Sequence, residues 1–265
     1  MSGTNRLDRE MVRRGLAPSR ARAQQQIVAG LVRVNGSVVR KAAEQVGPAD
    51  QVSATADPYV SRAAHKLLGA LDDLGLEVAG RALDAGASTG GFTQVLLERG
   101  CRRVYAVDVG TAQLAGALRN DPRVTVWEQT NLREVELRHV GGTPVDLVVA
   151  DVSFISLVLL VERLGALTRS DGQLLLMVKP QFEVGRELLS KGGVVRSPEH
   201  HRRAVTAVAV EARRHGWHLQ QVVRSRLPGP AGNLEYFVLL AAQPAGVGPD
   251  LDAVIPDALR PGAEA

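Results

Sequence analysis

LDAGASTGGF, residues 83–92, is the segment that most clearly indicates the fold class of this chain. An apolar burst, RALDA at 81–85, leads into it, an acid stands at Asp84, and a run of small residues opens a helix. In α/β sheets such a strand-to-helix turn lies at the carboxyl ends of the strands, where ligands bind. The stretch therefore predicts an α/β sheet with a site for a nucleotide-like group.

From Val78 onward, short runs of apolar residues, called bursts here, alternate with segments that have a helical pattern. The helical segments, such as 155–167 and 200–216, predict right-handed crossovers between parallel strands. The last two bursts are joined only by the turn-rich PGPAGN, so they should pair antiparallel. We expect a seven-stranded sheet with one reversed strand at the end, built from bursts at 81–85, 103–109, 124–129, 145–151, 172–180, 219–225 and 235–241.

Positive charge is concentrated at the N-terminus. Residues 1–50 contain nine Arg or Lys and four Asp or Glu, a net charge of +5, whereas the whole chain carries +4. A small basic module attached to a near-neutral body indicates a polyanion-binding appendage, most often for nucleic acid. The alternative is a solvated basic surface.

The same module has the pattern of two short helices and a hairpin. Gly15 should end the first helix, Ser19 should cap the second, Gly30 should close it, and Asn35-Gly36 predicts a tight turn. The segment contains no aromatic residue, which argues against a platform that stacks single-stranded bases. The helical spacing rests on Leu7, Met11, Val12, Ala21, Ile27 and Val28.

Composition excludes several classes of protein. The 45% hydrophobic content predicts a globular protein with one full core and a small second domain. The N-terminus lacks an apolar signal-type segment, and no run of about 18 uncharged apolar residues occurs. The single cysteine, Cys101, cannot form an internal disulfide, and no zinc-ligand spacing is present. We expect a cytoplasmic protein without a metal.

The glycine turn can be assigned a ligand by elimination. A Walker-type phosphate loop needs a lysine where Phe92 stands, and the GxGxxG fingerprint fails because Ser88 lies two residues after Gly86. Asp84 would repel a pyrophosphate but can receive an ammonium, and Asp108 at the end of the next strand can accept hydrogen bonds from ribose hydroxyls. The two acids favour S-adenosylmethionine (SAM), against the alternative that they only cap strand ends.

Four charged residues are expected beside this turn. Asp151 and Lys179 end the fourth and fifth strands, Glu235 begins the reversed strand, and Lys66 lies on the helix that enters the domain. Only four of the 32 basic residues are lysines. Lysine at two of these positions therefore suggests chemistry that arginine cannot perform, since arginine is effectively never deprotonated.

These residues resemble a known family. The order Lys66, Asp151, Lys179, Glu235 is similar to the K-D-K-E tetrad of FtsJ-like RNA ribose 2'-O-methyltransferases, and VVADVSFIS, VKPQFEVG and LPGPAGNLEYF resemble the TlyA (hemolysin A) subfamily. The pattern around LVRVNG resembles an S4 RNA-binding domain, covering about residues 5–50. In the S4 family the two helices meet structured RNA through its shape and phosphates.

The resemblance implies a Rossmann-like, seven-stranded SAM-dependent methyltransferase sheet behind a small α+β S4 domain. It implies methyl transfer from SAM to cytidine 2'-hydroxyls in ribosomal RNA, of the small subunit (16S) and in some members of the large one (23S). In the family this modification is associated with susceptibility to capreomycin- and viomycin-type antibiotics, and some members have a hemolytic phenotype. The expected partner is ribosomal RNA in ribosomal subunits, with the protein a monomer or weak dimer and no membrane partner.

We expect Lys179 to act as the base or orienter, Asp151 to position it, Glu235 to hold the charge state of the lysines and Lys66 to stabilise the developing oxyanion. A flipped nucleotide would meet Phe154 and Arg133. The expected cofactor-binding residues are Asp84, Ala85, Gly86, Ser88, Thr89, Gly90, Gly91, Asp108, Val109 and Asn131. The expected RNA-binding residues are Arg6, Arg14, Arg20, Arg22, Lys41, Arg133 and Phe154.

The expected domains are an S4-like module with the start of a linker at 1–56, an interdomain linker at 57–60, a methyltransferase domain at 61–242 and a flexible tail at 243–265. Two features depart from the family pattern. Ala63 stands where the family commonly has glycine, and Pro58-Tyr59-Val60 stands where it often has a Trp before the Val. If the glycine needed a positive φ, Ala63 would strain the helix that enters the domain.

Three rival functions remain to be weighed. A non-catalytic RNA-binding factor would have a broken tetrad or a blocked glycine turn, and neither is visible in the sequence. A pseudouridine synthase can also carry an S4 domain, but it has no SAM loop. An exported pore-former would need a membrane-competent segment.

Overall fold

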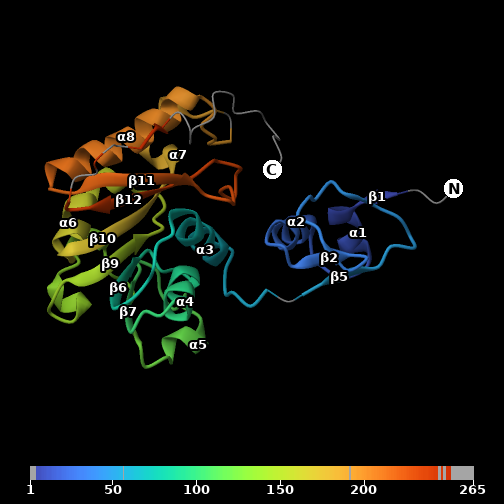
Figure 1. The fold of residues 1–265 in the computed structure, drawn as a ribbon, viewed down its shortest axis with the longest axis horizontal. Helices are drawn as coiled ribbons and strands as arrows, with labels where there is room; N and C mark the ends of the chain where they lie inside the picture. The colour runs from blue at the N-terminus through green and yellow to red at the C-terminus, as the bar shows by residue number, and fades with distance from the viewer. Residues whose placement is uncertain (1–3, 56, 191, 244–245, 247–248, 252–265) are drawn as a thin grey trace. The chain divides into compact units, whose positions relative to one another are not determined.

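The computed structural model describes residues 4–55, 57–190, 192–243, 246 and 249–251. The chain divides into two compact units, one containing the residues up to Arg62 and the other beginning at Ala63 (Figure 1). The domain limits inferred from sequence remain a prediction. Most of the expected tail at 243–265 lies outside the described residues.

The N-terminal unit contains two short helices and five short strands. The helices lie against each other, β1 pairs with β4, and β3, β2 and β5 form a three-stranded antiparallel sheet. The elements are β1 (Asn5–Arg6), α1 (Leu7–Arg13), α2 (Arg20–Val28), β2 (Val32–Val34), β3 (Ser37–Val38), β4 (Gln45–Val46) and β5 (Val52–Ala54).

Local sequence signals set the limits of these elements. Gly15 and Gly30 have φ of +72° and +75°, which suits glycine at a helix end. The hydroxyl of Ser19 accepts a hydrogen bond from the backbone N–H of Arg22 at 3.2 Å, as expected for a helix cap. Asn35 and Gly36 have φ of +50° and +84° and join β2 to β3, which is the predicted tight hairpin.

The buried face of α2 differs from the one read from the sequence. Ala21 and Val28, expected on the apolar stripe, are exposed, whereas Ile27 is fully buried as expected, together with Ala23 one turn earlier. The helix is therefore rotated relative to the expected apolar stripe. The core of the unit consists of Leu7, Met11, Ala17, Ala23, Ile27, Val32 and Val46.

The larger unit is built on a seven-stranded sheet in the order β11-β12-β10-β9-β6-β7-β8. The pairs from β10 to β8 are parallel, and β12 is antiparallel to both β10 and β11. The seven strands were all predicted, but the reversed strand is inserted between β11 and β10 and is not at the edge. The strands are β6 (Arg81–Ala85), β7 (Arg103–Val107), β8 (Val124–Trp127), β9 (Val145–Ala150), β10 (Thr168–Val178), β11 (His218–Arg224) and β12 (Tyr236–Ala241).

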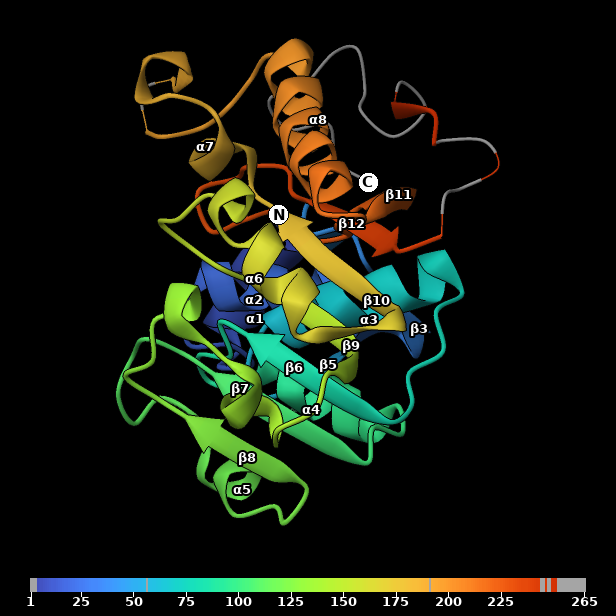
Figure 2. The same cartoon turned by 90° about the vertical axis from the view of Figure 1, so that its left-hand side faces the viewer.

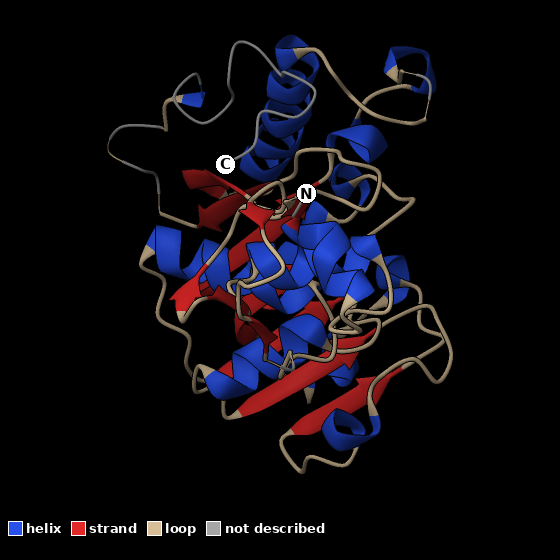
Figure 3. Cartoon of the chain, turned by 90° about the vertical axis from the view of Figure 1, so that its right-hand side faces the viewer, coloured by secondary structure: helices blue, strands red, loops and turns tan. Residues whose placement is uncertain are grey.

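Helices cover both faces of this sheet, and Figures 2 and 3 show the chain from opposite sides. On one face α3 (Ala63–Leu74) packs against α4 (Gly91–Glu98), and on the other α6 (Val161–Ala166) packs against α8 (Pro198–Arg214). The segment 155–167, predicted as one helix, is broken into η3 and α6. The short helices are α5 (Gly116–Arg119), α7 (Pro180–Glu183), η1 (Leu132–Glu134), η2 (Leu137–Val140), η3 (Leu157–Leu159) and η4 (Arg186–Leu188).

The central strands are buried because helices cover both of their faces. Leu83 and Ala85 on β6 and Val148 and Ala150 on β9 are all fully buried. This explains why these strands read as continuous apolar bursts rather than as alternating patterns. Ala63 begins α3 without a positive φ, so the departure from the family's glycine introduces no backbone strain there.

Within the part of the chain that the structure describes, no helix is both long and apolar enough to cross a membrane.

Candidate active site

The glycine turn after β6 adopts a backbone that needs small residues. Gly86, Ser88 and Gly90 have φ of +87°, +47° and +98°. A Cβ atom on Gly86 would lie 2.7 Å from the carbonyl oxygen of Asp151 on the neighbouring strand end. Glycine is required at Gly86 both by its conformation and by this close approach.

Asp84, just before the turn, is fully buried. Its Oδ2 accepts a hydrogen bond from the hydroxyl of Thr93 at 2.6 Å, whereas its Oδ1 has no partner among the described residues. Burial raises the pKa of Asp84 to about 7, the Thr93 hydroxyl opposes the rise, and the negative charges of Asp151 and Asp108 add to it. A cationic ligand group would satisfy Oδ1 and favour the ionised carboxylate.

Asp108 ties the glycine turn to the loop after β7. Its Oδ2 accepts from the backbone N–H of Ser88 at 2.8 Å, and its Oδ1 accepts from that of Gly110 at 2.7 Å. The hydroxyl of Ser88 donates to the side-chain oxygen of Gln113 at 3.1 Å. The two loops therefore form one connected rim, to which sequence reasoning assigned Asp108 and Ser88 but not Gly110 or Gln113.

The four charged residues of the predicted tetrad form two ion pairs. Lys179 Nζ lies 2.6 Å from Asp151 Oδ1 and donates to the hydroxyl of Ser153 at 2.9 Å. Lys66 Nζ is hydrogen-bonded to Glu235 Oε2. Lys66, Lys179 and Glu235 are 4%, 8% and 1% exposed, which is unusual for charged side chains and is tolerated because they are paired.

Sheet register explains how distant residues come to one rim. Val178 of β10 pairs with Tyr236 of β12, so Lys179 and Glu235 occupy the next position on adjacent antiparallel strands. Asp151 directly follows Ala150, the last residue of β9, and its N–H donates to the carbonyl of Ala85 on β6 at 3.1 Å. Gly229 leaves room for Glu235, since a Cβ there would lie 2.7 Å from Glu235 Oε1.

Val109 and Thr89 lie on these two loops, and Asn131 lies between β8 and η1. Val109 is 74% exposed beside Asp108. The carbonyl of Thr89 accepts from the N–H of Ala115. The side chain of Asn131 accepts from the N–H of Arg133 at 3.0 Å and so caps η1. No signal in the sequence pointed to Thr93, because this residue lies among apolar residues on the buried side of α4.

The arginines predicted to bind RNA are ion-paired within the N-terminal unit. Buried Asp8 accepts from Arg6 and Arg20, and buried Glu10 accepts from Arg14. Burial acts to raise the pKa of Asp8, but hydrogen bonds from Arg6, Gln24 and Arg20 hold it at about 2. Hydrogen bonds from Arg13 and Arg14 lower the pKa of Glu10 to about 2.

Arg14 is the most enclosed of these arginines. Its guanidinium also donates to the carbonyls of Asp50 at 2.6 Å and Gly47 at 3.0 Å, and its side chain is 20% exposed. Arg22 lies 3.7 Å from Asp57, and Lys41 is exposed. Arg14 thus has a structural role that the sequence did not reveal.

Phe154 and Arg133, in the larger unit, are both exposed. Phe154 is 92% exposed and has a φ of +65°, and its ring centroid lies 5.2 Å from that of Phe182.

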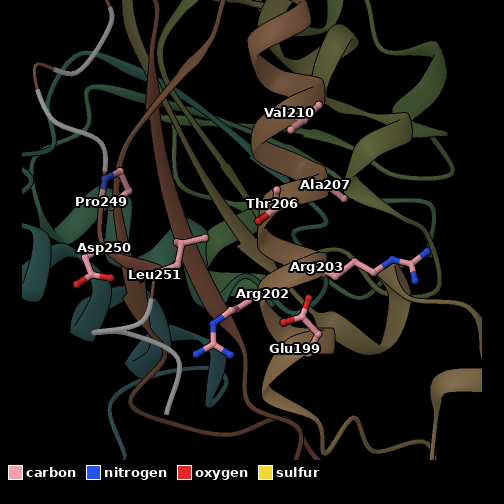
Figure 4. Close-up of a pocket in the computed structure, with 9 residues that line it drawn as sticks. All are labelled: Glu199, Arg202, Arg203, Thr206, Ala207, Val210, Pro249, Asp250 and Leu251. Atoms are coloured by element: carbon pink, nitrogen blue, oxygen red, sulfur yellow. The ribbon is translucent and has the colours of Figure 1, made fainter. Parts of the chain in front are cut away.

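A separate pocket lies along α8 (Figure 4). None of the candidate site residues lines it. Its walls are Glu199, Arg202, Arg203, Thr206, Ala207, Val210 and Pro249–Leu251. In the described ranges, no group of three or more His, Cys, Asp or Glu side chains is arranged to hold a metal ion.

Two family models match the chain, the FtsJ-like methyltransferase at residues 59–242 and the S4 domain at residues 5–52. The chain is 50% identical over 247 residues to the 16S/23S rRNA (cytidine-2'-O)-methyltransferase TlyA of Mycobacterium tuberculosis, covering 92% of each chain. It is 35% identical to Hemolysin A of Brachyspira hyodysenteriae, covering 88% of this chain and 98% of that one. A solved structure from Streptococcus thermophilus, named as a candidate hemolysin, aligns with a TM-score of 0.72 at 35% identity over 96% of this chain and 95% of that chain.

The two family models, the sequence identity to the relatives and the arrangement of the four charged residues all point to the same family. The chain belongs to the TlyA family of FtsJ-like methyltransferases, with an S4 domain at its N-terminus.

Proposed function

We propose that this protein transfers a methyl group from SAM to cytidine 2'-hydroxyls of ribosomal RNA. The observation that carries the proposal is the pair of buried ion pairs, Lys66–Glu235 and Lys179–Asp151, at the strand ends beside the glycine turn. The name of the M. tuberculosis relative supports the substrate. A ribosomal substrate also favours the cytoplasm, and loss of activity should reduce susceptibility to capreomycin- and viomycin-type antibiotics.

The residues around the glycine turn fit SAM. The unpartnered Oδ1 of Asp84 can receive the ammonium group of the ligand, and Asp108 can accept from ribose hydroxyls. When bound, SAM supplies a methyl group on a positively charged sulfur. Gly86 and Gly90 hold the positive-φ backbone of the turn, where a Cβ would collide with Asp151 or with Leu114 and Leu118. Ala85, Ser88, Thr89, Gly91, Val109 and Asn131 complete the proposed set.

The lysine pairs carry the proton chemistry. A ribose hydroxyl has a pKa far above neutrality, so its proton must be removed as the oxygen gains the methyl group. Lys179, held by Asp151 and Ser153, orients the hydroxyl; as the methyl group is transferred, one ammonium proton of Lys179 passes to Asp151 and the lysine nitrogen takes the proton of the hydroxyl. Lys66, held by Glu235, stabilises the negative charge that develops on the oxygen.

RNA recognition would be divided between the two units. In the N-terminal unit, Arg6, Arg14, Arg20, Arg22 and Lys41 would meet phosphates. In the larger unit, Phe154 would stack on a nucleotide turned out of its helix, and Arg133 would meet the backbone.

The test is to incubate the protein with labelled SAM and separate 30S, 50S and 70S particles and to map the modified nucleotides. We expect a 2'-O-methylated cytidine in at least one subunit. Absence of label in all three particles, with SAM binding intact, would contradict the proposal. The choice between 16S and 23S rRNA follows from which particle is labelled.

A further inference from the structure

One side chain joins the two segments that follow the Lys179–Asp151 ion pair. Residues 152–157 follow Asp151, and α7 follows Lys179. Glu183, the last residue of α7, reaches back to the first segment. Its Oε2 accepts from the hydroxyl of Ser156 at 2.5 Å, and its Oε1 accepts from the N–H of Leu157 at 2.8 Å.

The segment is thus fixed at both ends. At its beginning, Lys179 donates to the hydroxyl of Ser153 at 2.9 Å. At its end, Glu183 holds Ser156, whose own hydroxyl accepts from the N–H of Val158 at 3.2 Å and caps η3. Removing Glu183 would take away the side-chain hydrogen bonds to Ser156 and Leu157 at the end of the segment.

Phe154 lies between these two anchors in a conformation that needs support. Its φ of +65° is in the left-handed region, which a bulky residue adopts only where its surroundings hold it. Its ring is 92% exposed, so burial of the ring does not supply that support. The neighbouring contacts are the ring of Phe182 and the anchors at Ser153 and Ser156.

The environment of Glu183 indicates a specific role for its carboxylate. Burial raises its pKa, and hydrogen bonds from Ser156, Leu157 and Val158 oppose the rise. An apolar residue could fill such a site without the cost of desolvating a charge. The carboxylate is distinguished from an apolar residue by two directed hydrogen bonds that set the path of the segment.

We propose that Glu183 is a positioning residue that fixes residues 152–157 and thereby sets where Ser153 meets Lys179 and where Phe154 presents its ring. This inference rests on the proposed function, since its consequence is a dependence of methyl transfer on a residue that does not touch the reacting atoms.

The first test compares Glu183→Ala with Glu183→Gln in single-turnover methyl transfer on ribosomal particles. Glu183→Ala should lower the rate by roughly 100-fold, the cost of misplacing reacting groups by about 1 Å. Its affinity for SAM should be unchanged. Glu183→Gln keeps an acceptor for Leu157 and a polar group for Ser156, so its rate should stay within about threefold of the wild type. Glu162→Ala, on the exposed surface of α6, is the matched control.

The second test asks whether Glu183 acts through Phe154. In a double-mutant cycle, Glu183→Ala should lower the rate of methyl transfer by a much smaller factor in the Phe154→Ala background than in the wild type. Amide hydrogen exchange of residues 152–158 should be faster in Glu183→Ala and unchanged in Glu183→Gln, with α8 unaffected in both variants.

If Glu183→Ala and Phe154→Ala lower the rate of methyl transfer independently, Glu183 does not have the proposed positioning role. The same follows if amide hydrogen exchange of residues 152–158 is unchanged in Glu183→Ala. Wild-type protein that transfers no methyl group would overturn the proposed function instead. The exchange measurement still decides the position of the segment in that case, because it needs no turnover.

Discussion

Lys66 and Glu235, 169 positions apart in the sequence, form an ion pair in which both side chains are almost fully buried. Removal of one partner would leave an uncompensated charge in the interior. We expect Lys66→Ala and Glu235→Ala each to lower the free energy of unfolding by about 3–5 kcal/mol. Replacing both residues, Lys66→Met with Glu235→Leu, should recover most of that loss in urea unfolding.

The double variant also separates stability from chemistry. It should remain inactive in methyl transfer although it is folded, because it lacks the lysine that we propose to stabilise the oxyanion. A double variant that is both stable and active would refute a catalytic role for this pair.

Lys179 provides the most direct test of the proposed chemistry. Lys179→Ala should abolish methyl transfer and leave SAM binding, measured by calorimetry, unchanged. Lys179→Arg keeps the charge opposite Asp151 but cannot give up a proton, so it should also be inactive. Turnover in the alanine variant would remove Lys179 from the role of base or orienter.

Asp84 should make stability and SAM affinity depend on pH. Its pKa is raised from 3.8 to about 7, so the folded state binds a proton more tightly than the unfolded state does. Stability relative to Asp84→Asn is therefore greatest below about pH 4, falls by roughly 1.4 kcal/mol per pH unit as pH rises toward 7, and is constant above that. The measurement is urea unfolding of both ligand-free proteins between pH 4 and pH 8.

A cationic ligand reverses this preference. It favours ionised Asp84, so SAM should bind more tightly as pH rises through 7, and Asp84→Asn should lose that dependence. Equal pH profiles for the two proteins would show that Asp84 does not meet the positive end of the ligand.

Gly86 can be tested against a glycine of similar backbone conformation. Gly86→Ala adds strain at φ +87° and a Cβ 2.7 Å from the Asp151 carbonyl, whereas Gly142→Ala adds strain at φ +83° in open space. Gly142→Ala should cost about 1–3 kcal/mol in thermal unfolding and leave SAM binding intact. Gly86→Ala should cost more and abolish SAM binding. Equal costs would mean that the close approach to Asp151 is unimportant.

Arg14 and Arg13 differ in how far the N-terminal unit encloses their side chains. Both bond Glu10, but Arg14 also bonds two carbonyls and is 20% exposed, against 63% for Arg13. Arg14→Ala should destabilise the N-terminal unit by about 1–3 kcal/mol, and Arg13→Ala should have a smaller effect. Hydrogen exchange of α1 reports this difference. If Arg14→Ala weakens RNA binding without faster exchange, its main role is at the RNA.

Local patterns in the sequence were sufficient to predict most elements. Strands β6 to β12 follow apolar bursts, and the hairpin follows Asn35-Gly36, because each depends on residues close together in the chain. The sequence pattern was a weaker guide to the buried face of a helix where two possible faces are similarly apolar. The buried face of α2 uses Ala23 in place of Ala21, a choice made by packing against α1 and β2.

Residue type and short-range spacing were enough to predict the methyltransferase sheet, its glycine turn and the members of the proposed tetrad, because each of these has a pattern that can be read along the chain. Which lysine pairs with which carboxylate depends on the folded chain, as do the insertion of β12 between β10 and β11 and the bond between Glu183 and Ser156. The pairing of Asp8 and Glu10 with the arginines also depends on the folded chain. These contacts join segments whose approach is set by strand order, core packing and the burial of charge, none of which has a local signature in the chain.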